Sequence, residues 1–276
     1  GFWIDEFDID GIRLDCADCL EFSFMEEMRR FTNEKKADFW LMGEVIHGDY
    51  SRYVKPEMLD SVTNYELHKG LYSGHNDHNY FEIAHTIRRE FENGGIYKGL
   101  RLYSFVDNHD VDRIASKLNV PEHIFTVYTL LFTLPGIPSI YYGSEWGIQG
   151  RKEGGNDDPL RPAVDIEEAL LHPDNPQLLK WVTLLGRIHS QEPALADGRY
   201  QELLLTNRQY AFARILGEEG IVVAVNNDDR PAELCIREPL SGKSWASLID
   251  GREPELQDGS LRVTLAPGES QIYKLK

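Results

Sequence analysis

The sequence predicts an α/β fold for residues 1–192 and an all-β sandwich for residues 193–276. Up to Glu192, short apolar runs that fit buried strands alternate with amphipathic helical segments, and this alternation is typical of parallel β/α units. Beyond Glu192, short apolar stretches follow one another directly, separated by Gly, Asn, Asp and Pro. This spacing is typical of an antiparallel β-sandwich. We therefore expect two domains that meet near residue 192.

Five strands are expected in the first domain, because short apolar runs of this kind suit strands buried on both faces. They comprise residues 12–14, 39–45, 58–64, a run that ends at residue 107, and 137–142. The second domain is expected to contain strands at residues 202–206, 209–215, 221–226, 232–237, 244–248, 260–265 and 270–274.

The helices of the first domain are predicted from apolar residues at intervals of three and four. They are residues 21–36, a second helix that carries Ile83, Ile87 and Phe91 on one face and ends before residues 93–95, then 121–134 and 178–188. Asp77 is expected to cap the second helix, and Pro121 to occupy the first helical position of the third. Phe2, Trp3, Ile4 and Phe7 are spaced to bury against a neighbouring element.

Charge and hydropathy exclude two classes of partner. The 276 residues carry a formal net charge of −17, which opposes nucleic acid and anionic membrane surfaces. The longest apolar stretch, residues 124–134, is shorter than the roughly 18 residues that a membrane span needs. We expect no nucleic acid and no membrane as a partner, whereas a neutral ligand such as a sugar is compatible with this charge.

The three cysteines are expected to be reduced. Cys16, Cys19 and Cys235 cannot all pair, and a bridge between Cys16 and Cys19 at a strand end would be strained. No second C-x-x-C follows this pair, so we expect no metal site. Reduced thiols favour a cytoplasmic location.

Three acidic residues stand where strands are expected to end: Asp15 in GIRLDCAD, Glu44 in WLMGEV and Asp110 in YSFVDNHD. The carboxyl ends of parallel barrel strands gather at one rim, where active sites lie, so the three side chains are expected to meet. A glycosidase needs such a pair of carboxyl groups. Arg13 lies two residues before Asp15, on the same strand face, where its guanidinium would keep Asp15 ionised.

These segments, with VTNYEL around Asn64 and GIPSIYYGSEWG from Gly136 to Gly147, resemble the α-amylase family, glycoside hydrolase family 13, in order and spacing. The resemblance covers nearly the whole chain and is closest to the neopullulanase, cyclomaltodextrinase and maltogenic amylase branch. It implies a (β/α)8 TIM barrel of which this chain holds strands four to eight with their helices. Five strands cannot close a barrel, so we expect a fragment that lacks the amino-terminal part.

The resemblance implies a role for each candidate residue. Asp15 corresponds to the nucleophile, Glu44 to the general acid and base, and Asp110 to the acid that binds hydroxyls of the distorted sugar. His109 is similar to the family histidine that binds the same sugar, and Asn108 is expected to orient the turn.

Weaker candidates come from residues near the other strand ends. Aromatic rings there fit either sugar-stacking positions or the core; they are His47, Tyr65, His68, Tyr142 and Trp146. His47 and Tyr65 complete the expected substrate-binding set with Arg13, His109 and Asn108. Arg161, in NDDPLRP, is expected to be structural, and Arg113 to pair with an acid.

The expected function is hydrolysis of α-glucosidic bonds in maltodextrins, cyclodextrins or pullulan by double displacement with retention, with transfer to a second sugar as a further outcome. The chain alone is expected to be inactive or nearly so. No cofactor is expected in it, and calcium would belong to the preceding part of the barrel. Expected partners are the α-glucan, the missing amino-terminal half and further copies of the chain.

Two alternatives stay open at this point. One is a catalytically inactive amylase-like subunit for binding or assembly, against which the presence of Asp15, Glu44 and Asp110 argues. The other is a sucrose or trehalose specialist of the same family.

Overall fold

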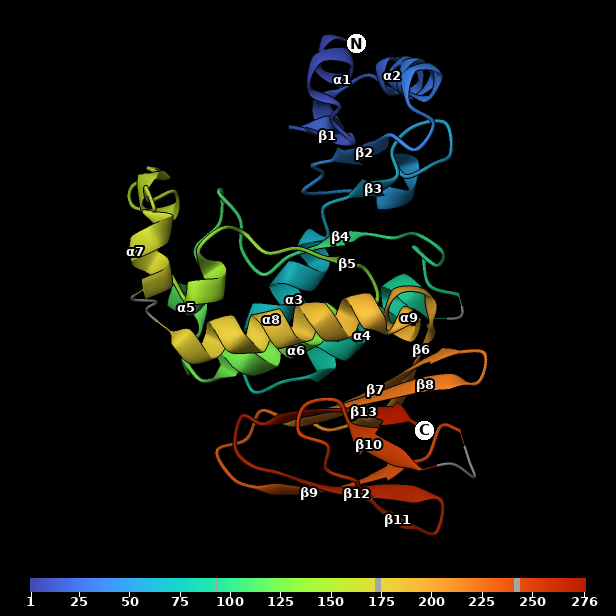
Figure 1. The fold of residues 1–276 in the computed structure, drawn as a ribbon, viewed down its shortest axis with the longest axis vertical. Coiled ribbons are helices and arrows are strands. Elements are labelled where there is room, and N and C mark those ends of the chain that lie inside the picture. The colour runs from blue at the N-terminus through green and yellow to red at the C-terminus, as the bar shows by residue number, and fades with distance from the viewer. Residues whose placement is uncertain (93, 172–174, 241–243) are drawn as a thin grey trace.

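The computed structural model describes residues 1–92, 94–171, 175–240 and 244–276. Figure 1 shows an elongated chain in three tiers. Strands β1 to β3 lie with α1 and α2 at one end, a layer of long helices occupies the middle, and antiparallel sheets form the other end, where the chain terminates. The predicted combination of an α/β part and a later all-β part is confirmed.

The strands of the first part run parallel, as predicted. They are β1 (Gly11–Leu14), β2 (Trp40–Gly43), β3 (Ser61–Val62), β4 (Tyr103–Ser104) and β5 (Ile137–Pro138). One sheet has the order β1-β2-β3 and a second pairs β4 with β5. A parallel bridge between Thr63 and Tyr103 joins them, so the strands follow one another in chain order. Their carboxyl ends therefore share one edge.

The last three of these strands are shorter than predicted. After β3 the chain turns at once into a helix, because Asn64 accepts a hydrogen bond from the Leu67 N–H (2.9 Å) and caps it. In β5, Pro138 has no N–H to donate to the ladder. Among the described residues, β1 and β5 are the outer strands of this row and each has one unpaired edge.

Most predicted helices are confirmed with shifts of a few residues at their ends. They are α2 (Phe22–Lys35), α4 (Phe81–Phe91), α6 (His123–Thr133) and α8 (Pro176–Gln191). Shorter helices that the sequence did not predict are α1 (Phe2–Phe7), α5 (Ile114–Lys117), α7 (Ile166–Leu171) and α9 (Pro193–Asp197), with 3-10 turns at Ala17–Cys19, Tyr50–Arg52, Ser144–Trp146 and Asp158–Leu160.

Two predicted helix starts are wrong, and one longer helix was missed. The missed helix is α3 (Tyr65–Asn76), and Asp77 is its C-cap rather than the cap of α4, whose N-cap is Tyr80. Pro121 lies two residues before α6 and not at its first position.

Helix α3 depends on a neighbour that its own sequence does not reveal. Gly70 and Gly74 weaken it as an isolated helix, but they let α4 approach closely. A Cβ on Gly74 would lie 3.0 Å from Ile83 Cγ1, and one on Gly70 would lie 3.4 Å from Thr86 Oγ1. The packing of α3 on α4 therefore stabilises a helix whose propensity alone is poor.

The helical layer and the large antiparallel sheet share one apolar core. Side chains of α3, α4, α6 and α8 pack together with Tyr210, Phe212, Val223 and Ile272 of the sheet. Phe2, Trp3 and Phe7 were expected to bury, but they are 59–66% exposed and contact mainly one another, with ring centroids 5.1–6.0 Å apart. For these three residues the expectation is wrong within the described chain, since no element covers this face of α1. Ile4, the fourth residue of the expected set, does pack against a core cluster.

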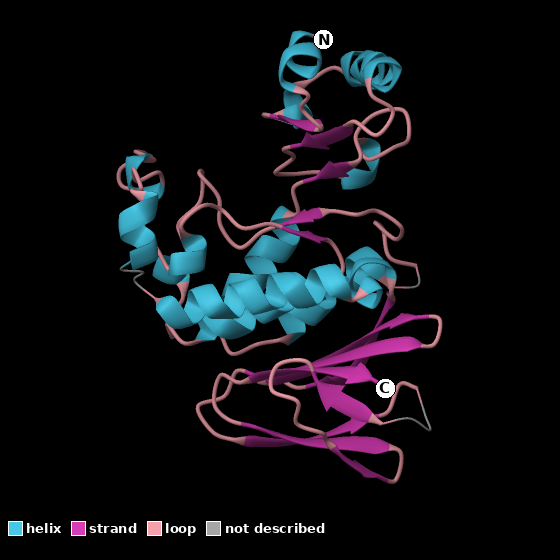
Figure 2. Cartoon of the chain, viewed as in Figure 1, coloured by secondary structure: helices cyan, strands magenta, loops and turns pink. Residues whose placement is uncertain are grey.

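The second part is a sandwich of two antiparallel sheets (Figure 2). One has the order β10-β13-β8-β7-β6 and the other β11-β12-β9. Between them lies a separate core that includes Ala211, Ala224, Leu234, Trp245 and Leu261. The strands are β6 (Arg199–Leu205), β7 (Gln209–Leu216), β8 (Glu219–Asn226), β9 (Ala232–Arg237), β10 (Trp245–Ser247), β11 (Glu255–Gln257), β12 (Ser260–Leu265) and β13 (Ser270–Leu275). Strand β11 was not predicted because all three of its residues are exposed.

A buried histidine makes the stability of this fold sensitive to acid. His75 is fully buried at the end of α3, where its Nδ1 lies 2.6 Å from the Leu71 carbonyl oxygen. Burial lowers its pKa from 6.5 to about 3. Below pH 6.5 the unfolded chain therefore binds a proton at this residue that the folded chain does not bind.

We predict that the free energy of unfolding falls as the pH drops from 6.5 towards 3, by about 1.4 kcal/mol per pH unit for this residue. His75→Gln removes the titrating group, so its urea midpoint should depend less on pH between 7 and 5 than that of the wild type. His85→Gln, at an exposed histidine of α4, is the control. Equal pH slopes for wild type and His75→Gln would contradict the prediction.

Candidate active site

The three candidate acids line one cavity at the carboxyl ends of the parallel strands. The cavity has a volume of about 710 Å³, and its lining comprises Asp15, Cys16, Glu44, Ile46, Tyr65, His109, Asp110, Val111, Lys152 and Arg161. Residues nearly a hundred positions apart in the sequence thus meet at one place, as the strand-end argument predicts.

The pairing of β1 with β2 sets the distance between Asp15 and Glu44. Leu14 is in register with Gly43, so each acid is the first residue beyond its own strand. Backbone bonds continue past the ladder, from Glu44 N–H to Leu14 O (2.9 Å) and from Ala17 N–H to Glu44 O (2.8 Å). Oxygens of the two carboxyl groups lie within 4.8 Å of each other. The side chain of Glu44 is 5% exposed, whereas that of Asp15 is 72% exposed.

Arg13 is shared by both carboxylates. Its guanidinium donates a hydrogen bond to Asp15 and lies 2.9 Å from Glu44 Oε2. This hydrogen bond, and secondly the positive charge, hold the pKa of Asp15 below its usual value. Asp15 is therefore an anion at neutral pH, as a nucleophile requires.

Glu44 receives two further hydrogen bonds. The Tyr65 hydroxyl donates to Oε1 (3.2 Å), and the Cys16 N–H donates to Oε2 (3.3 Å). Burial and these contacts fix the orientation of the carboxyl group. Tyr65, which the sequence left between core and site, is part of the site.

Asp110 is positioned by its own loop. The Asn108 Oδ1 accepts hydrogen bonds from the N–H groups of Asp110 (2.8 Å) and Val111 (3.1 Å), which is an Asx turn. Asn108 also donates to the Tyr65 hydroxyl (3.1 Å) and so links this loop to Glu44. His109 Nε2 lies 3.0 Å from Asp110 Oδ2. The expected orienting action of Asn108 matches this geometry.

Arg161, which was expected to be structural, is one of the residues that line the cavity. Its guanidinium lies 3.0 Å from Asp110 Oδ1 and donates a hydrogen bond to the His109 carbonyl oxygen (3.1 Å). The sequence signal was weak because Arg161 lies in an irregular loop, 51 residues beyond Asp110.

His47 was expected to bind substrate, but the structure does not bring it into the cavity. It is exposed and absent from the lining, although its neighbour Ile46 lines the cavity. His68 and Trp146 are buried, and His68 stacks on Phe105 with 5.0 Å between ring centroids. These two aromatic rings belong to the core. Tyr142 lies outside the lining as well.

Asp15, Cys16 and Glu44 are close enough together to be considered as metal ligands. Two observations argue against this chemistry. The positive charge of Arg13 already contacts both carboxyl groups and repels a cation there. The pKa of the Cys16 thiol is raised, first by the charge of Asp15, so the thiolate that a metal needs is disfavoured. All three cysteines are free, as predicted.

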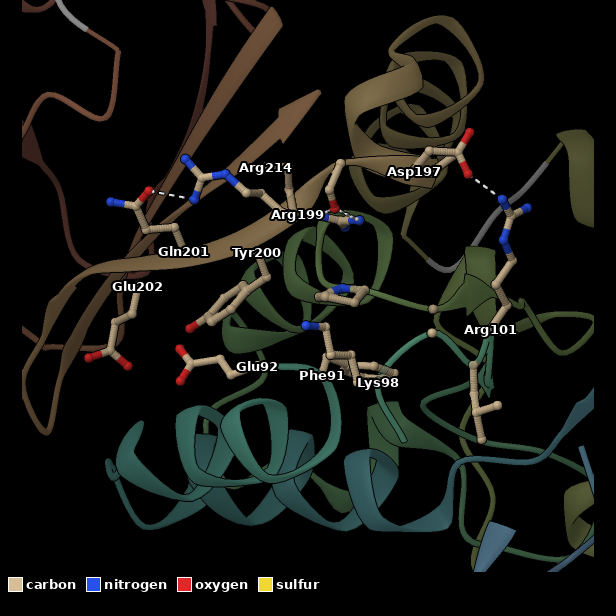
Figure 3. A pocket seen from close by; sticks show the side chains of 16 residues that line it. Phe91, Glu92, Lys98, Arg101, Asp197, Arg199, Tyr200, Gln201, Glu202 and Arg214 are labelled. Carbon is tan, nitrogen blue, oxygen red and sulfur yellow. Dashed lines mark hydrogen bonds and ion pairs between the residues drawn. The ribbon is translucent and has the colours of Figure 1, made fainter. Parts of the chain in front are cut away.

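A second cavity lies far from these acids, at the amino ends of β4 and β5 and along β6 (Figure 3). Arg101 and Asp197 face each other across it as an ion pair. Tyr200 and Glu202 of β6 line its other side. None of the three candidate acids lines this cavity, so the first cavity is the candidate active site.

Two family models match the chain. The model described as Alpha amylase, catalytic domain, matches residues 1–181, and that of Maltogenic Amylase, C-terminal domain, matches residues 200–272. The chain belongs to the α-amylase family. The predicted membership, and its closeness to the neopullulanase and cyclomaltodextrinase branch, is confirmed.

Similar curated proteins include Neopullulanase 2 of Thermoactinomyces vulgaris, 28% identical over 98% of this chain, and the cyclomaltodextrinase of Geobacillus thermopakistaniensis, 26% identical over 100%. The intracellular maltogenic amylase of Bacillus subtilis strain 168 is 25% identical over 98%. The chain spans 46% of the length of each of these relatives.

Solved structures agree with this fold. An α-amylase of Anoxybacillus is 27% identical, with a TM-score of 0.82 over 99% of this chain and 60% of that one. A debranching enzyme from Nostoc punctiforme is 25% identical, with a TM-score of 0.81 over 99% of this chain and 59% of that one.

None of the described helices combines the length and the hydropathy that a membrane span requires.

The contact of Arg13 with both carboxyl groups leads to a prediction that can be tested without substrate. Arg13→Gln should raise the pKa of Asp15, because it removes both the hydrogen bond and the charge that lower it. The carboxyl carbon of Asp15, followed by NMR through a pH titration, reports the change. Arg30→Gln, at an exposed arginine of α2, should leave the titration of Asp15 as it is. An unchanged midpoint in Arg13→Gln would rule out the proposed electrostatic role.

Proposed function

We propose that this protein hydrolyses α-glucosidic bonds with retention of configuration, by double displacement. The observation that carries the proposal is the separation of Asp15 and Glu44, whose oxygens lie within 4.8 Å of each other. Retaining glycosidases hold their two carboxyl groups about 5 to 5.5 Å apart, whereas inverting enzymes need roughly 6.5 to 9.5 Å to admit a water molecule. The geometry favours retention.

The two acids have different environments that suit different roles. Asp15 is ionised and exposed to the cavity, and it would attack the anomeric carbon while the glycosidic bond breaks. Glu44 would give its proton to the leaving oxygen, and later take a proton from the water that releases the sugar from Asp15. Attack by a sugar hydroxyl in place of water would give transfer.

Asp110 and His109 would bind hydroxyl groups of the same glucosyl unit. The proposal is supported by their position in the cavity of Asp15 and Glu44. Contacts that strengthen as the ring distorts lower the barrier, because they bind the transition state better than the ground state.

We propose maltodextrins, cyclodextrins and pullulan as the substrate class. The names of two relatives, neopullulanase and cyclomaltodextrinase, support this class, and the chain spans 46% of the length of each. A cytoplasmic location is supported by the relative named intracellular maltogenic amylase.

We also propose that turnover needs further barrel strands beside β1. The edge of β1 is unpaired in the described chain, and the side chain of Asp15 is 72% exposed. Water reaches this nucleophile freely, whereas a closed active site excludes water and thereby strengthens its electrostatic interactions. The amino-terminal half of a barrel would supply both the strand partner and the missing wall.

The roles of the two acids can be tested by substitution in the full-length protein. Asp15→Asn should abolish turnover of maltotriose, since no ester can form. Glu44→Gln should slow it by roughly a hundredfold to ten-thousandfold, and less for an activated aryl glycoside whose leaving group needs no proton. Asp38→Asn, at an exposed acid before β2, should behave like the wild type.

Two outcomes would contradict the proposal. If Asp15→Asn turns over maltotriose as fast as the wild type, Asp15 is not the nucleophile. If the full-length wild type binds maltodextrin but neither hydrolyses nor transfers it, the protein is a binding subunit.

A further inference from the structure

Arg113 lies outside the cavity, yet its side chain joins three loops that surround it. It is fully buried. Its Nε donates to the Leu160 carbonyl oxygen (3.1 Å), and its Nη1 donates to the Tyr142 carbonyl oxygen (2.6 Å) and to Ser144 Oγ (3.0 Å). Arg113 had been expected to pair with an acid. It binds carbonyl and hydroxyl oxygens instead.

The guanidinium is enclosed on its flat face as well. Its central carbon lies 4.1 Å from the ring centroid of Tyr141 and 5.0 Å from that of Tyr142. The backbone N–H of Arg113 donates to Gly150 O (3.0 Å). A Cβ on Gly150 would lie 2.3 Å from Pro159 O and 3.2 Å from Arg113 Cγ, so only glycine lets these segments approach so closely.

A buried carboxylate completes the arrangement. Asp107 accepts hydrogen bonds from Ser144 Oγ (2.8 and 2.9 Å) and from the Ile114 N–H (2.8 Å). Ser144 therefore stands between the Arg113 guanidinium and the Asp107 carboxylate. Hydrogen bonds through Ser144 therefore link Arg113 and Asp107, the two ends of the loop that carries His109 and Asp110.

Each of the three joined loops adjoins a residue of the site. Residues 107–113 carry His109 and Asp110. Arg161, which contacts Asp110, directly follows Leu160. Tyr141 faces the His109 ring, with centroids 6.4 Å apart. One buried side chain thus sets the mutual position of three loops whose contacts determine where Asp110 points.

We propose that Arg113 is a positioning residue for Asp110 and His109 in the reaction described above, on which this inference rests. Its planar fork donates in several fixed directions at once. Lysine keeps the charge but cannot hold three loops in one plane. Without the fork, Asp110 would lose its alignment with the glucosyl unit held by Asp15 and Glu44.

The experiment measures turnover per competent site in the full-length protein. In 5-fluoro-α-glucosyl fluoride, the anomeric C–F bond breaks, fluoride leaves, and the sugar forms an ester with the Asp15 carboxylate. Mass spectrometry of the labelled protein counts the sites that still fold and react. The kcat and KM for maltotriose are then expressed per labelled site, so partial misfolding of a variant does not affect the comparison.

Arg113→Lys should lower kcat per labelled site by about ten- to a hundredfold, as expected for a misplacement near 1 Å, with KM within about twofold of the wild type. This split is expected because Asp110 would act mainly in the transition state. Ser144→Ala, a smaller change in the same network, should lower kcat in the same direction but less. Arg151→Lys is the matched control, since Arg151 lies in the same group of loops with its side chain 62% exposed.

Two results would overturn the inference. One is an Arg113→Lys protein with fewer labelled sites but wild-type kcat at each of them, since Arg113 would then only stabilise the fold. The other is an equal loss of kcat in Arg151→Lys. A wild type that takes up no label at Asp15 would instead contradict the proposed function, so the two failures are distinguishable.

Discussion

The site depends on the guanidinium of Arg13, which contacts the carboxyl groups of both Asp15 and Glu44. Two carboxylates at adjoining strand ends repel each other, and a pair this close tends to keep one proton. Arg13 contacts both, so Asp15 remains ionised while Glu44 stays within 4.8 Å of it. Because Arg13 lies two residues before Asp15, the two side chains leave the chain on the same face, and the guanidinium can reach both carboxyl groups. The different roles that we propose for the two acids follow from this contact and from their unequal exposure.

The two sides of the cavity are held by different means. Asp15 and Glu44 follow paired strands, and backbone hydrogen bonds past the ladder fix the chain at both. Asp110 lies on an irregular loop, where no ladder can fix it. Side chains hold this loop instead. Asn108 accepts a hydrogen bond from the Asp110 N–H, and the buried Arg113 donates hydrogen bonds to carbonyl oxygens of two neighbouring loops. Loops that carry function need such anchors when regular pairing ends.

Several features could be predicted because they depend on short stretches of sequence. The strands before Asp15 and Glu44 are apolar runs, and helices α2, α6 and α8 have clear helical periodicity. Helix α3 could not be predicted, because Gly70 and Gly74 argue against a helix until α4 packs on them. Arg161 and His47 show the same limit. Arg161 lines the cavity and His47 does not, because the course of an irregular loop determines the position of each.

By itself, the sequence determined the family motifs, the α/β and all-β parts, and the choice of Asp15, Glu44 and Asp110, because each is written in residues close together in the chain. Only the tertiary structure decided the distance between Asp15 and Glu44, the sharing of Arg13, the entry of Arg161 and the central place of Arg113. These depend on strand register and on contacts between loops tens of residues apart. Such contacts form only when the whole core packs, so no local pattern specifies them.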